Sequence, residues 1–290
     1  MRTSPMAGSL ACRTAQLSTP FASLKTMKTH RTAVIVFAAL ALFAAAPAAA
    51  QMSAYRFKAA NVPVGKVFHY TKSNLDGTHA TLISIFVPAT DRIEALKWDR
   101  GGSEATLIQA KMDWSKFSVC RFDGWRLSRD SVPEPRVTLD VQGDILSMSL
   151  MEKPLQISHW PWHSYDFDFT SLSFTLPHLQ NPEGTLAFWR TDFVYKDPPA
   201  VAELGEIQLR FEGRESRAGK SVRRYSIGGA GLQGSHGTWW ADRRTGLLVE
   251  YEIPVGDEPG YDSVRLKLTG TEKMSAQLWE EFKRQAVGSR

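Results

Sequence analysis

Hydrophobic and polar residues alternate along most of the chain with a period of two residues. Successive side chains of a β-strand point to opposite faces, so this pattern predicts strands with one buried face. Eight predicted strands precede a less regular middle region: Val67–Lys72, His79–Val87, Ile93–Trp98, Ala105–Asp113, Ser118–Phe122, Trp125–Ser128, Arg136–Val141 and Ile145–Met151. Six follow it: Leu186–Val194, Glu206–Glu212, Val222–Ile227, His236–Ala241, Leu247–Ile253 and Ser263–Thr269.

Short turn sequences between these strands predict that neighbouring strands run antiparallel. The dipeptides Asp76-Gly77, Asp123-Gly124 and Gly143-Asp144 lie between predicted strands, and such pairs adopt positive φ at little cost. Parallel pairing would need long crossover connections instead. The predicted fold class is therefore mainly β, as a curved antiparallel sheet or an incomplete barrel.

The strongest helical pattern lies at the C-terminus. Met274, Leu278 and Phe282 recur every four residues within 271–287, which predicts an amphipathic helix packed on the sheet or across its mouth. Residues 168–179 are compatible with one helical turn that Pro177 ends. No repeat or linker interrupts residues 51–290, so these residues are predicted to form one antiparallel β domain with this C-terminal helix.

Residues 1–50 have the pattern of an export signal and contain no acidic side chain. Lys28 and Arg31 precede the apolar run 33–46, and the small residues 48–50 suit cleavage after Ala50. The sequence therefore predicts a periplasmic protein, with secretion into the medium as the alternative. A retained membrane anchor is less favoured, because the run is shorter than a spanning helix needs. Met27 directly precedes Lys28, so residues 1–26 are interpreted as an over-long start; the true start is Met1 or Met27.

The basic charge belongs to this leader. The whole chain has 35 Lys and Arg against 30 Asp and Glu, and five of the cations lie in residues 1–50. Residues 51–290 are therefore formally neutral, which argues against nucleic acid as a partner. Cys120 is the single cysteine of that region and lies in an alternating stretch, so it is predicted to be a buried strand residue without a disulfide.

One glycine-rich segment matches the residue pattern of a cofactor-binding motif. Residues 229–234 fit the dinucleotide fingerprint GxGxxG after a predicted strand. That motif needs a helix next, whose N-terminal amides bind the pyrophosphate. The following residues 235–240 are strand-like instead, so the segment is predicted to be a flexible loop, and no cofactor is expected.

The segment 159–168 holds the densest group of reactive side chains. His159 and His163 have the spacing of a zinc-ligand pair, and Asp166 and Asp168 add carboxylates. That spacing aligns ligands only on a helix, and Pro161 disfavours one. The favoured interpretation is an aromatic loop that covers the end of the sheet, without metal or catalytic residues. The alternatives are a metal site on the two histidines, or an exported hydrolase or lyase that uses the His and Asp residues.

All nine tryptophans lie in residues 51–290. They either fill the inner face of a large curved sheet or line a cavity for an apolar ligand, and both interpretations stay open. The candidate ligand-binding residues are Trp98, Trp160, Trp162, Trp189, Trp239 and Trp240. Because adjacent strand residues point to opposite faces, one of Trp239 and Trp240 should lie inside, and the other outside under the C-terminal helix or a loop.

Two segments carry a resemblance to a known family. The pattern of residues 237–249 predicts a strand, an Asp-to-Gly turn and an apolar strand. The pattern of residues 64–70 predicts a small turn followed by the start of a strand. Both resemble bacterial periplasmic proteins of the lipoprotein-carrier (LolA/LolB-like) superfamily. The resemblance implies an incomplete antiparallel barrel around a helix, open to an apolar ligand such as an acyl chain, with no catalytic residues to carry over. The chain differs in length and around 159–182.

The leading functional hypothesis is thus an exported, non-enzymatic cell-envelope protein that binds an apolar or lipid-like ligand in an aromatic-lined groove. The alternatives are the hydrolase or lyase above and a structural protein whose sheet edge binds an envelope protein partner.

Overall fold

The computed structural model describes residues 52–129, 131–194, 199–254 and 260–288. The predicted export signal and the choice between Met1 and Met27 lie outside these residues. Contacts group Ala46–Arg290 into one compact unit, and the fold below is that of its described part.

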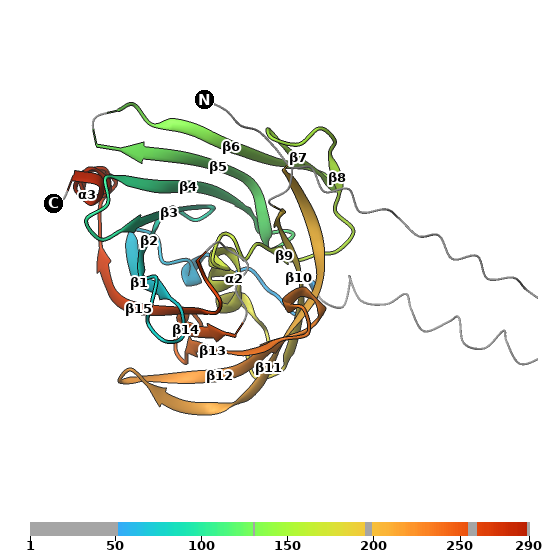
Figure 1. The fold of residues 1–290 in the computed structure, drawn as a ribbon. Coiled ribbons are helices and arrows are strands. Elements are labelled where there is room, and N and C mark those ends of the chain that lie inside the picture. The colour runs from blue at the N-terminus through green and yellow to red at the C-terminus, as the bar shows by residue number, and fades with distance from the viewer. Residues whose placement is uncertain (1–51, 130, 195–198, 255–259, 289–290) are drawn as a thin grey trace, which may run out of the picture. The chain divides into compact units, whose positions relative to one another are not determined.

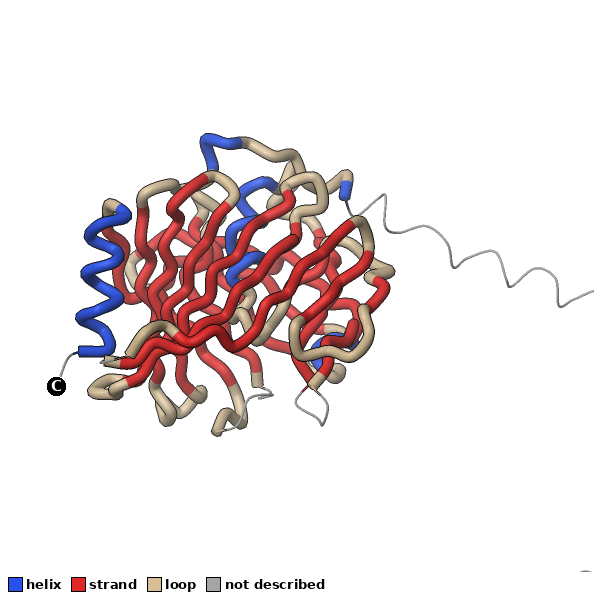
Figure 2. Tube along the Cα trace, turned by 90° about the horizontal axis from the view of Figure 1, so that it is seen from above, coloured by secondary structure: helices blue, strands red, loops and turns tan. Residues whose placement is uncertain are grey.

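Fifteen strands of this unit form one large, curved, open sheet (Figures 1 and 2). The predicted mainly β fold class is confirmed. The strands are β1 (Lys66–Ser73), β2 (Thr81–Ala89), β3 (Arg92–Asp99), β4 (Glu104–Asp113), β5 (Ser118–Ser128), β6 (Glu134–Gln142), β7 (Ile145–Met148), β8 (Leu155–Gln156), β9 (Trp162–His163), β10 (Thr185–Val194), β11 (Ala200–Arg217), β12 (Lys220–Gly228), β13 (His236–Asp242), β14 (Leu248–Ile253) and β15 (Val264–Lys273).

The strand order divides the chain into two meanders. From one edge to the other it reads β8 back to β1, then β15 back to β9. All pairs are antiparallel except β9 with β10, and the pairing of β1 with β15 joins the two meanders. The two edge strands, β8 and β9, are therefore consecutive in the chain, with only residues 157–161 between them.

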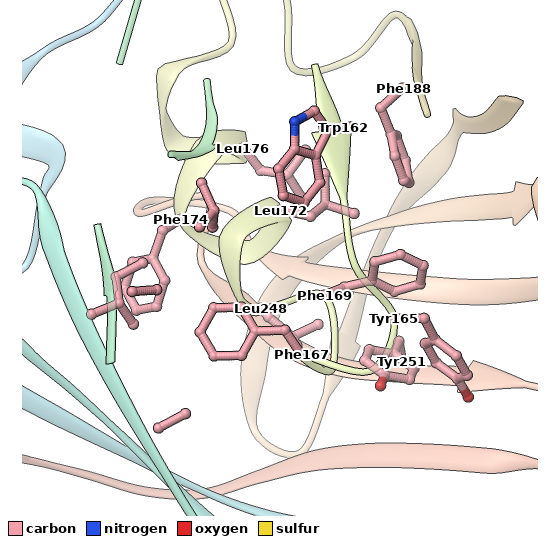
Figure 3. Packing of buried hydrophobic residues seen from close by; sticks show 14 of the residues in the cluster. Trp162, Tyr165, Phe167, Phe169, Leu172, Phe174, Leu176, Phe188, Leu248 and Tyr251 are labelled. Carbon is pink, nitrogen blue, oxygen red and sulfur yellow. The ribbon is translucent and has the colours of Figure 1, made fainter. Parts of the chain in front are cut away.

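The concave face of the sheet is filled by the middle of the chain rather than left open. Helix α2 (Thr170–Thr175) and the 3-10 turn η2 (Leu176–His178) lie inside the curve of the sheet (Figure 1), and every residue of α2 is buried. Figure 3 shows Phe167, Phe169, Leu172 and Phe174 packed in this interior. Residues 159–168, predicted to be a loop over the end of the sheet, contribute Trp162, Tyr165 and Phe167 to this same buried core.

The C-terminal helix α3 (Ala276–Gly288) packs on the opposite, convex face, beside β3 and β4. Its Trp279 joins a cluster with Val67, Phe86 and Leu96. The helix prediction is confirmed, but its start was wrong, since residues 271–273 continue β15. No helix in the described ranges is long and apolar enough to cross a membrane.

One predicted turn is part of a strand. Asp123-Gly124 lies inside β5, where a Cβ on Gly124 would approach Val137 Cγ1 of β6 to 2.7 Å. This glycine therefore permits close approach of the neighbouring strand at a bulge, and does not close a hairpin. The turns at Asp76-Gly77 and Gly143-Asp144 are confirmed, with positive φ at both glycines.

The remaining 3-10 turns are η1 (Ala59–Asn61) and η3 (Ala230–Leu232). The latter lies in the glycine-rich segment, whose next element is strand β13 rather than a helix. The segment is anchored, because Gly231 is buried and its carbonyl accepts a hydrogen bond from Arg190 Nη1 at 3.0 Å.

Candidate functional site

An open groove of about 820 Å³ is lined by residues at one end of β2 to β6. We call it the main groove. Its lining comes from β2 to β6 together with Leu150, Asp166 and Phe193. The full set is Thr81, Lys97, Trp98, Asp99, Glu104, Ala105, Thr106, Ile108, Phe122, Gly124, Trp125, Arg126, Arg136, Val137, Leu150, Asp166 and Phe193.

Apolar and aromatic side chains make up much of this lining. Ile108 and Phe122 are members of the interior core, and Val137 and Phe193 pack against it. The Phe122 and Phe193 rings lie 5.9 Å apart. Groups of this kind bind the apolar part of a ligand, while a few polar groups set its orientation.

Charged side chains occupy another part of the same lining. Arg126 forms ion pairs with Glu104 and, at 4.0 Å, with Glu134. Arg136 lies 3.2 Å from the same Glu134 carboxylate. All four side chains are well exposed, so their ion pairs contribute little to stability and give the groove a polar margin.

Lys97 connects the main groove to a buried ion cluster. Its Nζ atom lies 2.5 Å from Asp168 Oδ2 and donates a hydrogen bond to the Asp166 carbonyl at 2.7 Å. Asp168 is fully buried, and its Oδ1 atom lies 2.9 Å from Nζ of Lys72, which is itself 2 % exposed. Burial alone would raise the pKa of Asp168, but the two ammonium groups outweigh it and hold that pKa below its usual value.

A second buried ion pair fixes the loop before α2. Arg190 and Asp192 of β10 are both 3 % exposed and lie 2.7 Å apart. Asp192 Oδ1 accepts hydrogen bonds from Ser164 Oγ at 2.8 Å and from the Asp166 amide at 3.0 Å. The two ion clusters therefore fix residues 164–168 on the sheet, next to the main groove.

The four predicted His and Asp residues do not form one site. His163 is fully buried with Nδ1 2.8 Å from Ser171 Oγ, and burial lowers the pKa of His163 to about 3. His159 instead stacks on Trp189 with 3.4 Å between ring centroids. Asp166 lines the main groove, and Asp168 belongs to the buried ion cluster. Across the described ranges, no group of three or more His, Cys, Asp or Glu residues is placed to hold a metal ion.

Trp239 and Trp240 point to opposite faces of β13. Trp239 is fully buried in the interior, with its ring 5.4 Å from that of Tyr251. Trp240 lies on the convex face, where Arg217 covers its ring at 3.9 Å and Glu215 accepts its Nε1–H at 2.7 Å. Side chains of β11, two strands away in the sheet, therefore cover Trp240, not the C-terminal helix or a loop.

The other candidate tryptophans are also dispersed. Of the six, only Trp98 lines the main groove, where it also contacts Phe282 of α3 edge-on. Trp162 is buried, Trp160 lies under Lys116, and Trp189 stacks on His159. Ligand binding by these residues stays a prediction.

Sequence reasoning missed Trp125, Phe122 and Phe193 in the groove lining. The signal that could have indicated Trp125 is the preceding residue, Gly124. A glycine between strand-forming residues marks a place where the neighbouring strand, here β6, approaches closely. Cys120, predicted to be a buried strand residue, lies on β5 and is half-buried.

Comparisons with solved structures give a weak likeness, whereas comparisons of sequence give none. No protein-family model matches the sequence, and no curated protein matches it. Among solved structures, the chain is similar to a domain from Vibrio parahaemolyticus provisionally described as an outer membrane lipoprotein-sorting protein. That likeness has a TM-score of 0.20 and 9% identity, and it covers 79% of this chain and 94% of that chain.

Proposed function

We propose that this is an exported, non-enzymatic cell-envelope protein that binds an apolar or lipid-like ligand in the main groove. The observation that carries the proposal is the groove itself, about 820 Å³ in volume, with Ile108, Phe122, Val137 and Phe193 in its lining. This volume lies in the range of small-molecule sites, and the mixture of apolar wall and polar margin suits an amphiphile.

The position of the groove supports the same proposal. Helix α2 and its flanking aromatic residues fill most of the concave face, so a ligand in the groove would extend an existing hydrophobic core. Burial of apolar surface contributes about 25 cal/mol per Å², which makes such an extension favourable for a hydrocarbon chain.

The enzymatic alternative has less support. The described residues include two contacts between a serine and a histidine. Ser84 Oγ lies 2.7 Å from Nδ1 of His69, whose Nε2 lies 2.8 Å from Glu272 Oε1, but Ser84 is fully buried. Ser171 Oγ lies 2.8 Å from His163 Nδ1, and the cavity that Ser171 lines holds only about 20 Å³. That is room for about one water molecule and not for a substrate.

The interaction-protein alternative would use β8 or β9 as the exposed sheet edge. Each of these edge strands is only two residues long, so each offers few backbone groups for pairing with a partner strand.

A binding experiment with a filled groove tests the proposal. Thr106 of β4 is exposed and lines the groove, so Thr106→Trp should occupy the ligand volume without disturbing the core. Thr271→Trp is the matched control, because Thr271 is also exposed, on β15 and outside the groove. We expect detergent-free protein to carry lipid in native mass spectrometry and to bind a fluorescent fatty acid.

Thr106→Trp should weaken fatty-acid binding at least tenfold, whereas Thr271→Trp should leave it unchanged. Equal binding by the two variants would refute the groove as the site. Stoichiometric zinc in the native spectrum would support the enzymatic alternative, and a co-purifying protein the interaction alternative.

A further inference from the structure

A second cavity, of about 300 Å³, lies at the other ends of the strands from the main groove. Lys66, which begins β1, lines this cavity, whereas Thr81, which begins β2, lines the groove. Because β1 and β2 are antiparallel, these two residues lie at opposite ends of the strand pair. We call this the basic cavity. Its lining is Ala60, Asn61, Pro63, Lys66, Leu176, Pro177, Leu179, Pro182, Arg223, Tyr225, Arg244, Thr245, Gly246 and Leu247.

Long-range hydrogen bonds hold the walls of the basic cavity together. Asn61 Nδ2 donates to the Pro177 carbonyl at 2.6 Å, and Tyr225 Oη donates to the Pro182 carbonyl at 2.5 Å. Gly246, with φ of +76°, brings the β13–β14 turn against η2, where a Cβ would lie 3.0 Å from Pro177 Cα. Segments distant in sequence therefore form a fixed enclosure.

The charges on this enclosure are of one sign. Lys66, Arg223 and Arg244 line it, and none of its fourteen lining residues is Asp or Glu. Neither Lys66 nor Arg244 forms a side-chain ion pair with any residue in the described ranges. Grouped cations in a partly enclosed space create a positive potential that favours an anion.

The Arg223 side chain forms an ion pair with Glu183, yet one of its donors has no hydrogen-bond acceptor in the part of the chain that the structure describes. Its Nε atom is buried and lacks a hydrogen-bond acceptor among the described residues. The Glu183 Oε1 atom is 3.7 Å away, too far for a hydrogen bond, and it already accepts from Arg214 at 2.9 and 2.5 Å. A buried donor without an acceptor is costly, and an anion in the cavity would remove that cost.

We propose that the basic cavity binds a small organic anion, with a carboxylate or phosphate group on Lys66, Arg223 and Arg244. The apolar part of the ligand packs against Pro63, Leu176, Leu179 and Leu247. Guanidinium groups suit both anionic groups, because they present paired donors that match two oxygens. This site is separate from the main groove and does not depend on the proposed function.

Calorimetric titration of the full protein tests this proposal with three probes: inorganic phosphate, hexanoate and hexylammonium. The test variant is Lys66→Gln/Arg244→Gln, which removes two of the three lining cations and leaves the partly buried Arg223 in place. The control is Lys111→Gln/Lys153→Gln, which removes the same charge from exposed positions outside the basic cavity.

We expect at least one anion to bind, hexylammonium not to bind, and the test variant to bind the anion at least tenfold more weakly. The control variant should bind as the unchanged protein does. If only phosphate binds, the cavity is a phosphate site. If only hexanoate binds, the cavity recognises a carboxylate that carries an apolar tail. Binding of both probes identifies a site that recognises negative charge alone.

Three results would overturn the proposal: no anion binding at millimolar concentration, equal binding by the test variant and the unchanged protein, or equal weakening in the control. Circular dichroism of each variant establishes that it is folded. Arg223→Lys gives a further check, since it keeps the charge but loses the paired donors and should weaken binding with less disturbance than removal of the charge.

Discussion

At the scale of single residues, Asp168 combines a buried charge with an uncommon backbone conformation. It is fully buried between the ammonium groups of Lys72 and Lys97, and both Asp168 and Phe169 have φ near +50°. Non-glycine residues adopt that conformation only when the surroundings compensate for it. The ion cluster provides this compensation and positions the start of α2, so the packing of the concave face depends on one carboxylate.

We predict that Asp168→Asn lowers the free energy of unfolding by about 3–5 kcal/mol, because it leaves Lys72 buried beside a neutral partner. Asparagine has nearly the same shape and tolerates positive φ, so the backbone effect is small. Urea unfolding measures the change. Asp144→Asn is the control, since Asp144 pairs with Lys116 at an exposed position and should affect stability little.

The pH dependence gives a second measurement of the same carboxylate. Because the pKa of Asp168 is lower in the folded protein, its contribution to stability is full above the unfolded value, about pH 4. It is lost as the pH falls below that value through the folded pKa. Asp168→Asn should remove this acid-dependent part, and an unchanged acid profile in the variant would contradict the assignment.

At the scale of elements, helix α3 shows that its periodic pattern indicated only part of the packed face. Of Met274, Leu278 and Phe282, the first and last pack against the cluster that holds Trp279, whereas Leu278 is 52 % exposed. The buried side chains of the helix are Trp279, Lys283 and Val287. The Trp279 Nε1–H donates to Glu94 of β3 at 2.7 Å, and this bond fixes the helix rotation.

Trp279→Ala should therefore lower the free energy of unfolding by about 3–5 kcal/mol, by removing a large buried side chain and its hydrogen bond. Leu278→Ala, one residue earlier, should change it by less than about 0.5 kcal/mol, because the side chain is exposed. Thermal unfolding followed by circular dichroism compares the two. A larger effect at Leu278 than at Trp279 would show that the helix packs with its other face.

At the scale of the described unit, residues 157–161 pass between the two edges of the sheet. The Ile157 amide donates to the Asp144 carbonyl at 2.8 Å, beside β7 and β8. The Ser158 and His159 amides donate to Glu203 Oε1 of β11 at 3.1 and 3.2 Å. This short segment therefore hydrogen-bonds to both meanders where the strand ladder is interrupted.

We predict that Glu203→Ala loosens this connection without unfolding the sheet. Hydrogen bonds to a charged group contribute about 1.5–3 kcal/mol each, so exchange of the Ser158 and His159 amides should accelerate at least tenfold. Glu212→Ala is the control, since its carboxylate accepts a hydrogen bond from Ser226 Oγ instead. Unchanged exchange of these two amides in Glu203→Ala would mean that Glu203 does not hold the segment.

Much of the fold was predictable from the sequence because strand periodicity is a local property. The alternation along β2 to β4 and the glycine turns at Gly77 and Gly143 follow from the residues themselves, and so does the opposite placement of Trp239 and Trp240. These features depend on how successive side chains leave one strand. They hold wherever that strand lies in the molecule.

The candidate sites depended on the tertiary structure. Lys97 and Asp168 meet only because the middle of the chain folds into the concave face, and Lys66 and Arg223 line one cavity only because β1 joins β15 between the two meanders. Such contacts join residues dozens of positions apart, and no local pattern records them. The sequence by itself determined the strands and their alternation; the tertiary structure decided which buried faces met, because packing brings together side chains that the chain order keeps apart.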